Sequence, residues 1–508
     1  MRNSLFFIAI LLCWSQCGTK ETGQYRPNIL FAISDDQSYP HAGAYGYTAV
    51  STPNFDRIAN EGILFTNAFS AAPGCSPSRA SILTGRHIWQ IENAGTHASE
   101  FPMKYICYTD LLEGAGYHVG YTAKGWGPGN WEVSGRTRNP AGKEYSQIKD
   151  ENVAKFIRQT DYAANFEAFL NDRKNGQPFC FWYGASEPHR RYQKGVGVEN
   201  RIDLDKIVVP SFMPDVEEVR SDIADYLYEI QHFDKHLGRM IKKLEEIGEI
   251  ENTLIVVTSD NGMPFPRAKA NMYEYGFHMP FAARWGSEVK GGRIVDDLVS
   301  LTDLAPTFLE AAGVAHPSAE YPMIGRSIIN ILKSNQSGQV DESRTAIYSG
   351  RERHSSSRWN NLTYPQRAMR SQDFLYIRNF KPERWPAGAP EKFDKDGSLS
   401  IGYHDIDQFT ERYIYTHRED PEVRKYFDLA VGKRPAEELF DIKNDPGCMV
   451  NLADKEGFED VLKDHRELLN IRLKETEDPR VMGNGDIWEE YIRYSPIRSF
   501  PEPDWKKD

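Results

Sequence analysis

The chain has 508 residues, of which 40% are hydrophobic, 12% aromatic and 26% charged, as in an ordinary folded globular protein. Its 61 basic and 73 acidic side chains leave a net charge of −12. This balance argues against a nucleic-acid-binding protein, because such proteins usually carry an excess of basic residues. The length is compatible with about three domains, or with one large α/β domain and a smaller one.

The first residues are typical of a secretory signal. Arg2 precedes a short apolar run, 5–12, and small or polar residues follow it. The run is shorter than the roughly 20 apolar residues that a membrane-spanning helix needs, and no later segment is apolar enough to cross a membrane. We therefore expect 1–17 to be a signal peptide and the protein to be secreted or periplasmic. Cys17 is either a lipid-attachment site at the cell surface or a neighbour of a plain cleavage site.

Beyond the signal the chain contains four cysteines: Cys75, Cys107, Cys180 and Cys448. So few cysteines in a chain of this length are not a disulfide framework. Cys180 lies in an apolar run and is predicted to be a buried thiol.

Four apolar, β-rich segments each end abruptly in polar residues. They are Asn28–Ser34, 117–123, Phe179–Gly184 and Thr253–Ser259. Near-continuous apolar strands are typical of parallel sheets that helices cover on both faces. Helical patterns lie between them, at Pro53–Glu61 and at 215–248, so we predict an α/β fold with an open sheet.

The polar residues that follow these strands are candidates for a functional site. They are Asp35, Asp36, Lys124, His189, Asp260 and Asn261. Any one of them alone would more often be a turn or cap residue. In open α/β sheets, however, ligands bind beyond the carboxyl ends of the strands, so the shared placement predicts a site there.

The composition changes after about residue 365, where we place the start of a C-terminal subdomain. The stretch 369–379 alternates weakly and predicts an antiparallel strand, 438–442 predicts a short strand, and 458–477 predicts an amphipathic helix. We therefore expect a catalytic domain at 25–365 and a smaller α+β subdomain at 366–508.

The segment that starts Cys75-Ser76-Pro77-Ser78-Arg79 carries the chemistry. Ser76 is expected to cap a helix and Pro77 suits its first turn. Cys75 then lies at a helix N-terminus, where backbone N–H groups favour an anion, and Arg79 can reach back towards the same anion. An ordinary capped helix after a buried cysteine fits these residues equally well.

Cys75-x-Pro77-x-Arg79, followed by Leu83-Thr84-Gly85, resembles the signature of type I sulfatases. The resemblance extends to 26–36, 258–262 and 438–453, and it is closest to heparan N-sulfatases at 75–81, 187–190 and 260–266. It implies the alkaline-phosphatase-like fold: a large mixed, mostly parallel sheet sandwiched by helices, with a smaller α+β C-terminal subdomain.

The resemblance implies that a formylglycine-generating (sulfatase-maturing) enzyme oxidises Cys75 to formylglycine, whose hydrate is the nucleophile. It also implies one Ca²⁺ ion, held by Asp35, Asp36, Asp260, Asn261 and an oxygen of converted Cys75. These ligands are all oxygen donors, as calcium prefers.

The resemblance further implies roles for the basic residues of the site. Arg79, Lys124 and Lys269 would neutralise the sulfate oxygens. His189 would contact the sulfate and protonate the leaving atom, and Asp260 is a candidate base.

The sequence departs from the family two residues after Lys124. Many sulfatases have histidine there, whereas this chain has Trp126, whose indole cannot act as a base at neutral pH. His278 is a candidate substitute, and a structural histidine is the alternative. Substrate-binding candidates are Trp126, Arg136, Arg138, Arg190 and His278, and the alternative for the aromatic residues is that they pack a loop.

These observations predict a secreted, exo-acting glycan sulfatase. The substrate is either the N-sulfate of glucosamine in heparan-type glycans or an O-sulfate on galactose or an N-acetylhexosamine. Two other classes stay open: a phosphohydrolase or phosphotransferase of the same superfold, and a glycan-binding homologue in which Cys75 stays unconverted and no catalysis occurs.

Overall fold

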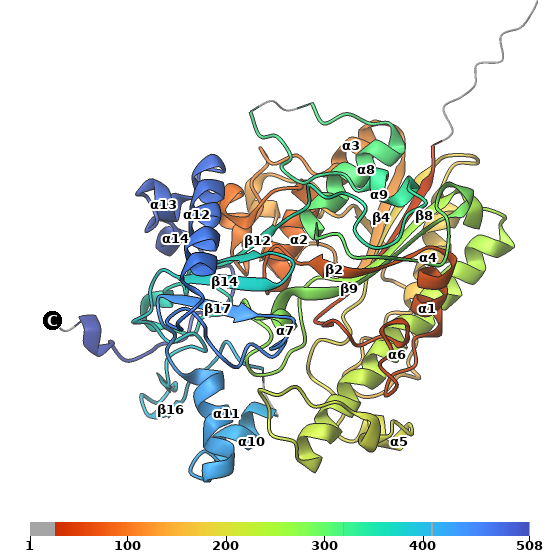
Figure 1. Ribbon diagram of the computed structural model, residues 1–508. Coiled ribbons are helices and arrows are strands. Elements are labelled where there is room, and N and C mark those ends of the chain that lie inside the picture. The colour runs from red at the N-terminus through yellow and green to blue at the C-terminus, as the bar shows by residue number, and fades with distance from the viewer. Residues whose placement is uncertain (1–25, 318–319, 408–409, 507–508) are drawn as a thin grey trace, which may run out of the picture.

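The computed structural model describes residues 26–317, 320–407 and 410–506 (Figure 1). The predicted signal segment 1–17, with Cys17, lies outside the described residues. Among the described helices, none is both long enough and apolar enough to cross a bilayer.

A nine-stranded sheet forms the centre of the protein. Its order is β10-β2-β9-β8-β1-β7-β4-β6, and β11 pairs with β2. The strands are β1 Asn28–Ser34, β2 Ile63–Phe69, β4 His118–Ala123, β6 Lys143–Glu144, β7 Phe179–Gly184, β8 Thr253–Ser259, β9 His278–Trp285, β10 Arg293–Val295 and β11 Val299–Ser300. Only β9 runs antiparallel to its neighbours, β2 and β8, so the predicted mixed, mostly parallel sheet is confirmed.

The four predicted strands are β1, β4, β7 and β8, and they lie side by side at the middle of this sheet. Their side chains alternate between two layers of helices, as the pleat of a strand requires. Ile29, Phe31 and Ile33 of β1 join one hydrophobic cluster, while Leu30 and Ala32 join the other. Each cluster buries one face of the sheet, which explains why the central strands are apolar at every position.

Helices cover both faces (Figure 1). One layer contains α1 Pro53–Glu61, α4 Tyr162–Asp172 and α6 Glu217–Glu246. The other contains α2 Cys75–Thr84, α3 Tyr108–Gly114, α8 Leu304–Ala312 and α9 Ile329–Lys333. The helices predicted at Pro53–Glu61 and 215–248 are thus confirmed. Short elements outside these layers are β3 Ser99–Glu100, β5 Gly129–Asn130, α5 Val196–Glu199 and α7 Glu274–Phe277.

A second, antiparallel sheet lies beside the first, with the order β12-β13-β14-β17. Its strands are β12 Ile347–Arg351, β13 Gln366–Arg370, β14 Phe374–Asn379 and β17 Glu437–Asp441. The single strand predicted at 369–379 is wrong, because a turn at Ser371 divides this stretch between two strands. The Ser371 backbone N–H donates to the Phe374 carbonyl at 3.0 Å and closes the turn. β12 precedes residue 366, so this sheet begins inside the segment that we assigned to the catalytic domain.

The remaining C-terminal elements surround this second sheet (Figure 1). They are β15 Glu391–Phe393, β16 Leu399–Ile401, α10 Thr410–Thr416, α11 Pro421–Val431, α12 Glu459–Glu475, α13 Pro479–Met482 and α14 Ile487–Glu490. Helix α12 buries Leu462, Leu469 and Leu473 in one cluster with Met369 and Tyr376 of the sheet. The predicted amphipathic helix at 458–477 is therefore confirmed.

The four cysteines of the described chain are free and buried. Cys180 lies inside β7 with 1% of its side chain exposed, which confirms the predicted buried thiol.

Candidate active site

Cys75 is the first residue of helix α2, and its side chain is 1% exposed. The N-cap is Gly74, so the predicted cap at Ser76 is wrong; the Ser76 hydroxyl donates instead to the Pro128 carbonyl at 2.6 Å. A Cβ at Gly74 would lie 3.0 Å from Nδ1 of His354, and glycine therefore permits a close approach at this point. Cys75 thus lies at a helix N-terminus, as predicted, where the first backbone N–H groups favour negative charge.

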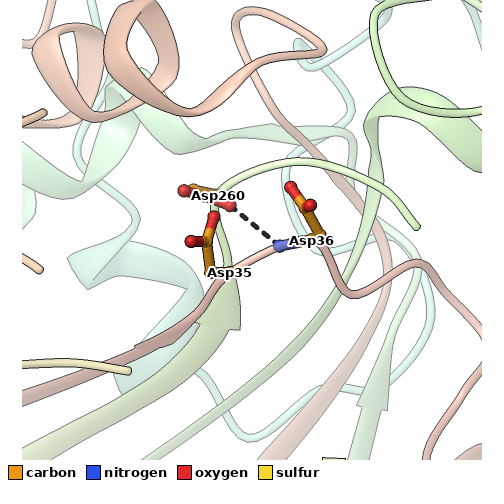
Figure 2. A group of neighbouring side chains, drawn as sticks. All are labelled: Asp35, Asp36 and Asp260. Carbon is orange, nitrogen blue, oxygen red and sulfur yellow. Dashed lines mark hydrogen bonds between the residues drawn. The ribbon is translucent and has the colours of Figure 1, made fainter. Parts of the chain in front are cut away.

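Three carboxylates meet where the two central strands end. Asp35 and Asp36 follow β1, Asp260 follows β8, and these strands are parallel neighbours. All three side chains are buried, and each offers an oxygen within 4.8 Å of the others (Figure 2). The backbone N–H of Asp36 donates to Oδ1 of Asp260 at 3.2 Å, which fixes the two strand ends relative to each other. The predicted grouping of these aspartates is thus present in the fold.

The donor set of this cluster fits a Ca²⁺ ion. The Asn261 amide donates to Oδ1 of Asp36 at 2.7 Å. Within the described part of the chain, Oδ1 of Asn261 and Oδ1 of Asp35 are buried and accept no hydrogen bond. Buried acceptors without a donor are costly, as are carboxylates placed against one another. A hard cation satisfies both, because it takes oxygen ligands only.

Each carboxylate of the cluster also contacts a basic side chain. Lys124 contacts Oδ2 of Asp35, Nζ of Lys269 lies 2.6 Å from Oδ2 of Asp36, and Nε of Arg79 lies 2.6 Å from Oδ2 of Asp260. The structure therefore brings all three predicted basic residues to the cluster. They come from three elements: the end of β4, the loop after β8, and helix α2.

Arg79 is fully buried and is held by more than its carboxylate partner. Its Nη1 donates to the carbonyls of Lys124 at 2.6 Å and of Gly125 at 3.2 Å. Nη2 is buried and, among the described residues, has no hydrogen-bond partner. One edge of the guanidinium thus fixes the fold locally, while a donor remains for an anion beside Cys75.

Opposing electrostatic effects set the pKa values of the carboxyl groups at the two strand ends. Burial raises the pKa of Asp260 to about 6, and Asp35 adds to this rise, although Arg79 opposes both. Burial also disfavours the charged form of Asp35, but Lys124, His189, Arg79 and Lys269 outweigh it and hold the pKa of Asp35 well below its ordinary range. Burial raises the pKa of the Cys75 thiol, despite Lys124 nearby. An unconverted Cys75 is therefore a poor thiolate nucleophile.

His189 faces the cluster from the loop after β7. Its Nε2 lies 3.9 Å from Oδ2 of Asp36, and its side chain is 37% exposed. Nδ1 lies 2.6 Å from the Arg190 carbonyl, so the proton on Nδ1 can be donated there and Nε2 is directed to the site. His189 and Lys124 line an open cavity of about 260 Å³ together with Asp35, Phe156, Ser186, Glu187, Arg190 and Arg191. A substrate that enters this cavity reaches the carboxylate cluster.

Trp126 does not form part of that cavity. Its indole is 3% exposed, donates from Nε1 to the Ser76 carbonyl at 3.1 Å, and packs edge-on against Phe101. Neither face is open to a sugar, so the prediction that Trp126 binds substrate is corrected: Trp126 is a core residue that supports the start of α2.

The other predicted substrate-binding residues have protein partners of their own. Arg136 and Arg138 both pair with Asp110 on helix α3, at 3.2 and 3.0 Å. The Arg190 guanidinium binds both carboxylate oxygens of Asp222, at 2.6 and 2.7 Å. His278 contacts Glu274 at 3.0 Å and the Thr66 carbonyl at 2.8 Å. The structure therefore does not bring Arg136, Arg138 or His278 to the cluster, and of these four only Arg190 lines the cavity.

Three polar residues beside the site could not be predicted from the sequence. Nε2 of His97 lies 3.5 Å from its Sγ, the His97 ring packs against His354 with centroids 4.8 Å apart, and Asp407 lies 3.3 Å from Nζ of Lys269. Burial lowers the pKa of His97 well below its ordinary value, and burial likewise lowers that of His354 to about 3. All three residues lie in loops outside the strand ends, so no strand or motif in the sequence pointed to them.

The site combines a buried helix N-terminus with a cluster of oxygen ligands and three basic side chains. On an α/β sheet, this combination is that of a hydrolase site for an oxyanion ester. The model of the sulfatase family matches residues 27–314, and a second model, described as N-sulphoglucosamine sulphohydrolase, C-terminal, matches residues 267–383. The chain therefore belongs to the sulfatase family, whose members hydrolyse sulfate esters or sulfamates.

Similar proteins include both N-sulfatases and O-sulfatases by name. The chain is 27% identical to a human N-sulphoglucosamine sulphohydrolase over 92% of its own length and 93% of the relative's. It is also 27% identical to an ulvan-active sulfatase of Formosa agariphila, over 86% of its own length and 78% of the relative's. An N-acetylglucosamine-6-O-sulfatase of Bacteroides thetaiotaomicron is 28% identical over 64% of this chain and 74% of the relative.

Solved structures share the fold. One is a protein in complex with its substrate D-glucosamine-2-N,6-O-disulfate, with a TM-score of 0.61 and 24% identity over 89% of this chain and 98% of the solved one. Another is a 2-O GAG sulfatase, with a TM-score of 0.63 and 20% identity over 95% of this chain and 99% of the solved one. At these identities the solved structures show the fold alone. They confirm the predicted fold, in which a large mixed, mostly parallel sheet lies between helices and a smaller subdomain follows.

Proposed function

We propose that this protein is an exo-acting glycan sulfatase whose nucleophile is the hydrate of a formylglycine made from Cys75. The observation that carries the proposal is the surroundings of Cys75. Lys124, Asp35, Lys269 and Asp260 all lie close enough to interact electrostatically with its thiol, at the N-terminus of α2. The thiol itself is buried with a raised pKa, so an ordinary cysteine would be inert here.

The hydrate has two hydroxyl groups on one carbon, which allows a two-step reaction. One hydroxyl attacks sulfur and leaves sulfate joined to residue 75 as an ester, while the sugar departs. The second hydroxyl then loses its proton, the C–O bond to sulfate breaks, and the aldehyde is restored. Serine or cysteine at position 75 could not follow this second route.

The side chains of the site have distinct roles in the first step. Arg79, Lys124 and Lys269 balance the charge of the sulfate oxygens, and they are preorganised because each is already held by a carboxylate. His189, reachable from the cavity, protonates the departing sugar atom. Asp260, whose pKa burial raises to about 6, is a candidate base for the attacking hydroxyl.

Asp35, Asp36, Asp260 and Asn261 would hold Ca²⁺, with an oxygen of the converted residue 75. Bound there, the ion would orient the hydrate, lower its pKa and polarise the sulfate. The buried oxygens of Asp35 and Asn261 that accept no hydrogen bond support this assignment.

Two substrates are candidates: the N-sulfate of glucosamine in heparan-type glycans, and an O-sulfate on galactose or an N-acetylhexosamine. The match to the N-sulphoglucosamine sulphohydrolase C-terminal model supports the first. The similar identity to the ulvan-active and N-acetylglucosamine-6-O-sulfatases supports the second. We also propose that a sulfatase-maturing enzyme converts Cys75, and that the protein is secreted or periplasmic, with Cys17 as a candidate lipid anchor.

The test is sulfate release from a defined panel of N-sulfated and O-sulfated mono- and disaccharides, with Cys75→Ala as the matched control. Release from N-sulfoglucosamine alone would select the first substrate, and release only from O-sulfated sugars would select the second. Faster hydrolysis of sugar phosphates than of every sulfated sugar would instead show a phosphohydrolase. Binding without hydrolysis, in protein whose residue 75 is still a thiol, would show the inactive glycan-binding homologue.

A further inference from the structure

The second step of the proposed reaction needs a base beside residue 75, and the residue at the usual family position cannot supply it. Trp126 occupies that position, and its indole donates to the Ser76 carbonyl instead of facing Cys75. His278, the substitute considered from the sequence, has both ring nitrogens engaged by Glu274 and by the Thr66 carbonyl. Neither residue is placed to take a proton from a group on residue 75.

His97 is placed to do so. Its Nε2 lies 3.5 Å from Sγ of Cys75, and this is the one side-chain hydrogen bond that Sγ makes with the described residues. Nδ1 is buried and has no hydrogen-bond partner in the described ranges, so no contact there draws the ring away from Cys75. With the ring proton on Nδ1, Nε2 presents a lone pair to residue 75.

His97 is held in this position by residues from later in the chain. Its backbone N–H donates to the Arg353 carbonyl at 3.1 Å, and Arg493 donates to the carbonyls of both His97 and His354, at 3.4 and 3.3 Å. The ring packs against His354, with centroids 4.8 Å apart. His97 therefore comes from the loop before β3, but residues of the C-terminal region fix its orientation.

We propose that His97 is the catalytic base that releases sulfate from residue 75, in place of a histidine at the position that Trp126 occupies. The inference rests on the proposed formylglycine mechanism. Nε2 takes the proton of the free hydroxyl on the sulfated hydrate, the oxygen electrons form the carbonyl bond, and the C–O bond to sulfate breaks with its electron pair on sulfate. The products are the aldehyde, free sulfate and a protonated His97, which returns its proton to water.

The experiment uses the full, matured chain with His97→Gln and His97→Asn, and the sugars of the panel that the wild type desulfates. Losing this base should lower kcat by about 10²–10⁴-fold, the usual share of general base catalysis. Each variant should still release one equivalent of desulfated sugar in a burst, because attack on sulfur does not need His97. The residue-75 peptide should then be heavier than the aldehyde hydrate by one SO₃ group.

His118→Gln is the matched control, because His118 is a half-buried histidine at the opposite end of β4. It should turn over like the wild type and show no sulfated peptide. Melting temperatures of all variants identify any that are misfolded, and either His97 variant that folds is sufficient for the comparison.

Two results would overturn the role of His97: wild-type turnover in a folded variant, or a loss of turnover with no burst and no sulfated peptide. A different result would contradict the proposed function itself. If the wild-type residue-75 peptide carries a thiol and no panel sugar loses sulfate, the formylglycine mechanism is wrong before His97 is considered.

Discussion

Replacing Arg79 by methionine probes the contact that joins helix α2 to the carboxylate cluster at the strand ends. Arg79 is fully buried and binds Oδ2 of Asp260 at 2.6 Å, the Lys124 carbonyl at 2.6 Å and the Gly125 carbonyl at 3.2 Å. Methionine has a similar length and fills the space, but it donates no hydrogen bond. The variant therefore leaves the Asp260 carboxylate buried beside Asp35 and Asp36 without the guanidinium that pairs with it.

Removing one partner of a buried ion pair costs about 3–5 kcal/mol, chiefly because the remaining charge stays buried and unpaired. We expect Arg79→Met to lower the free energy of unfolding by that amount in the absence of calcium. Loss of a preorganised donor to the sulfate should also reduce kcat by about 10²–10³-fold. The two effects are separable, since Arg79→Lys restores the charge but not the forked geometry and should recover more stability than activity.

Urea unfolding followed by circular dichroism measures the stability, and sulfate release measures kcat. Arg86→Met is the matched control, because Arg86 is also buried but donates to the carbonyls of Pro322 and Gln90 and has no carboxylate partner among the described residues. It should cost about 1–3 kcal/mol and leave kcat unchanged. If Arg79→Met is no less stable than Arg86→Met, or retains full kcat, the reasoning about Arg79 is refuted.

Three further predictions concern the cation, one ion pair and one aromatic residue. Chelation with EDTA should lower the melting temperature of the wild type, and calcium at 100 times its Kd should restore about 2.7 kcal/mol, whereas an unchanged melting temperature would reject the cation site. Burial opposes ionisation of Glu274, but Arg370 and His278 outweigh it and lower the pKa of Glu274 from 4.5 to about 2. The ionised Glu274 should therefore stabilise the fold by about 3 kcal/mol above pH 4.5, and this contribution should be lost as the pH falls towards 2. The difference in unfolding free energy between the wild type and Glu274→Gln, measured across that range, should fade on acidification, and a pH-independent difference would contradict it. Trp126→Ala should destabilise the protein by about 3–5 kcal/mol because it empties a core position, while an effect on KM alone would restore the interpretation of Trp126 as a substrate-binding residue.

The central strands and the carboxylate cluster could be predicted from sequence because one rule connects them. β1, β7 and β8 coincide with their predicted ranges, since strands buried on both faces leave an unbroken apolar signal. The carboxyl ends of parallel neighbours lie at one edge, so Asp35, Asp36 and Asp260 had to meet. The resemblance to sulfatases then supplied Lys269, which lies in a loop that no periodicity describes.

Other parts of the site depended on contacts between distant segments, which no local pattern reveals. His97 lies in a loop whose orientation is set by Arg353 and Arg493, more than 250 residues further along the chain. Trp126 is of a residue type that often binds sugars, but only its packing against Phe101 and its hydrogen bond to the Ser76 carbonyl show that it is buried. The hairpin of β13 and β14 was predicted as one strand, because a tight turn at Ser371 interrupts the alternation for only a few residues.

The state of residue 75 in the active protein is the most direct test of the formylglycine mechanism. Mass spectrometry of the peptide that contains it, after co-expression with a sulfatase-maturing enzyme, distinguishes a thiol from an aldehyde. The formylglycine mechanism predicts a peptide lighter by the exchange of CH₂SH for CHO, and a Cys75→Ser protein with nearly no turnover under the same conditions. A fully active preparation in which residue 75 is still an unmodified cysteine would contradict it.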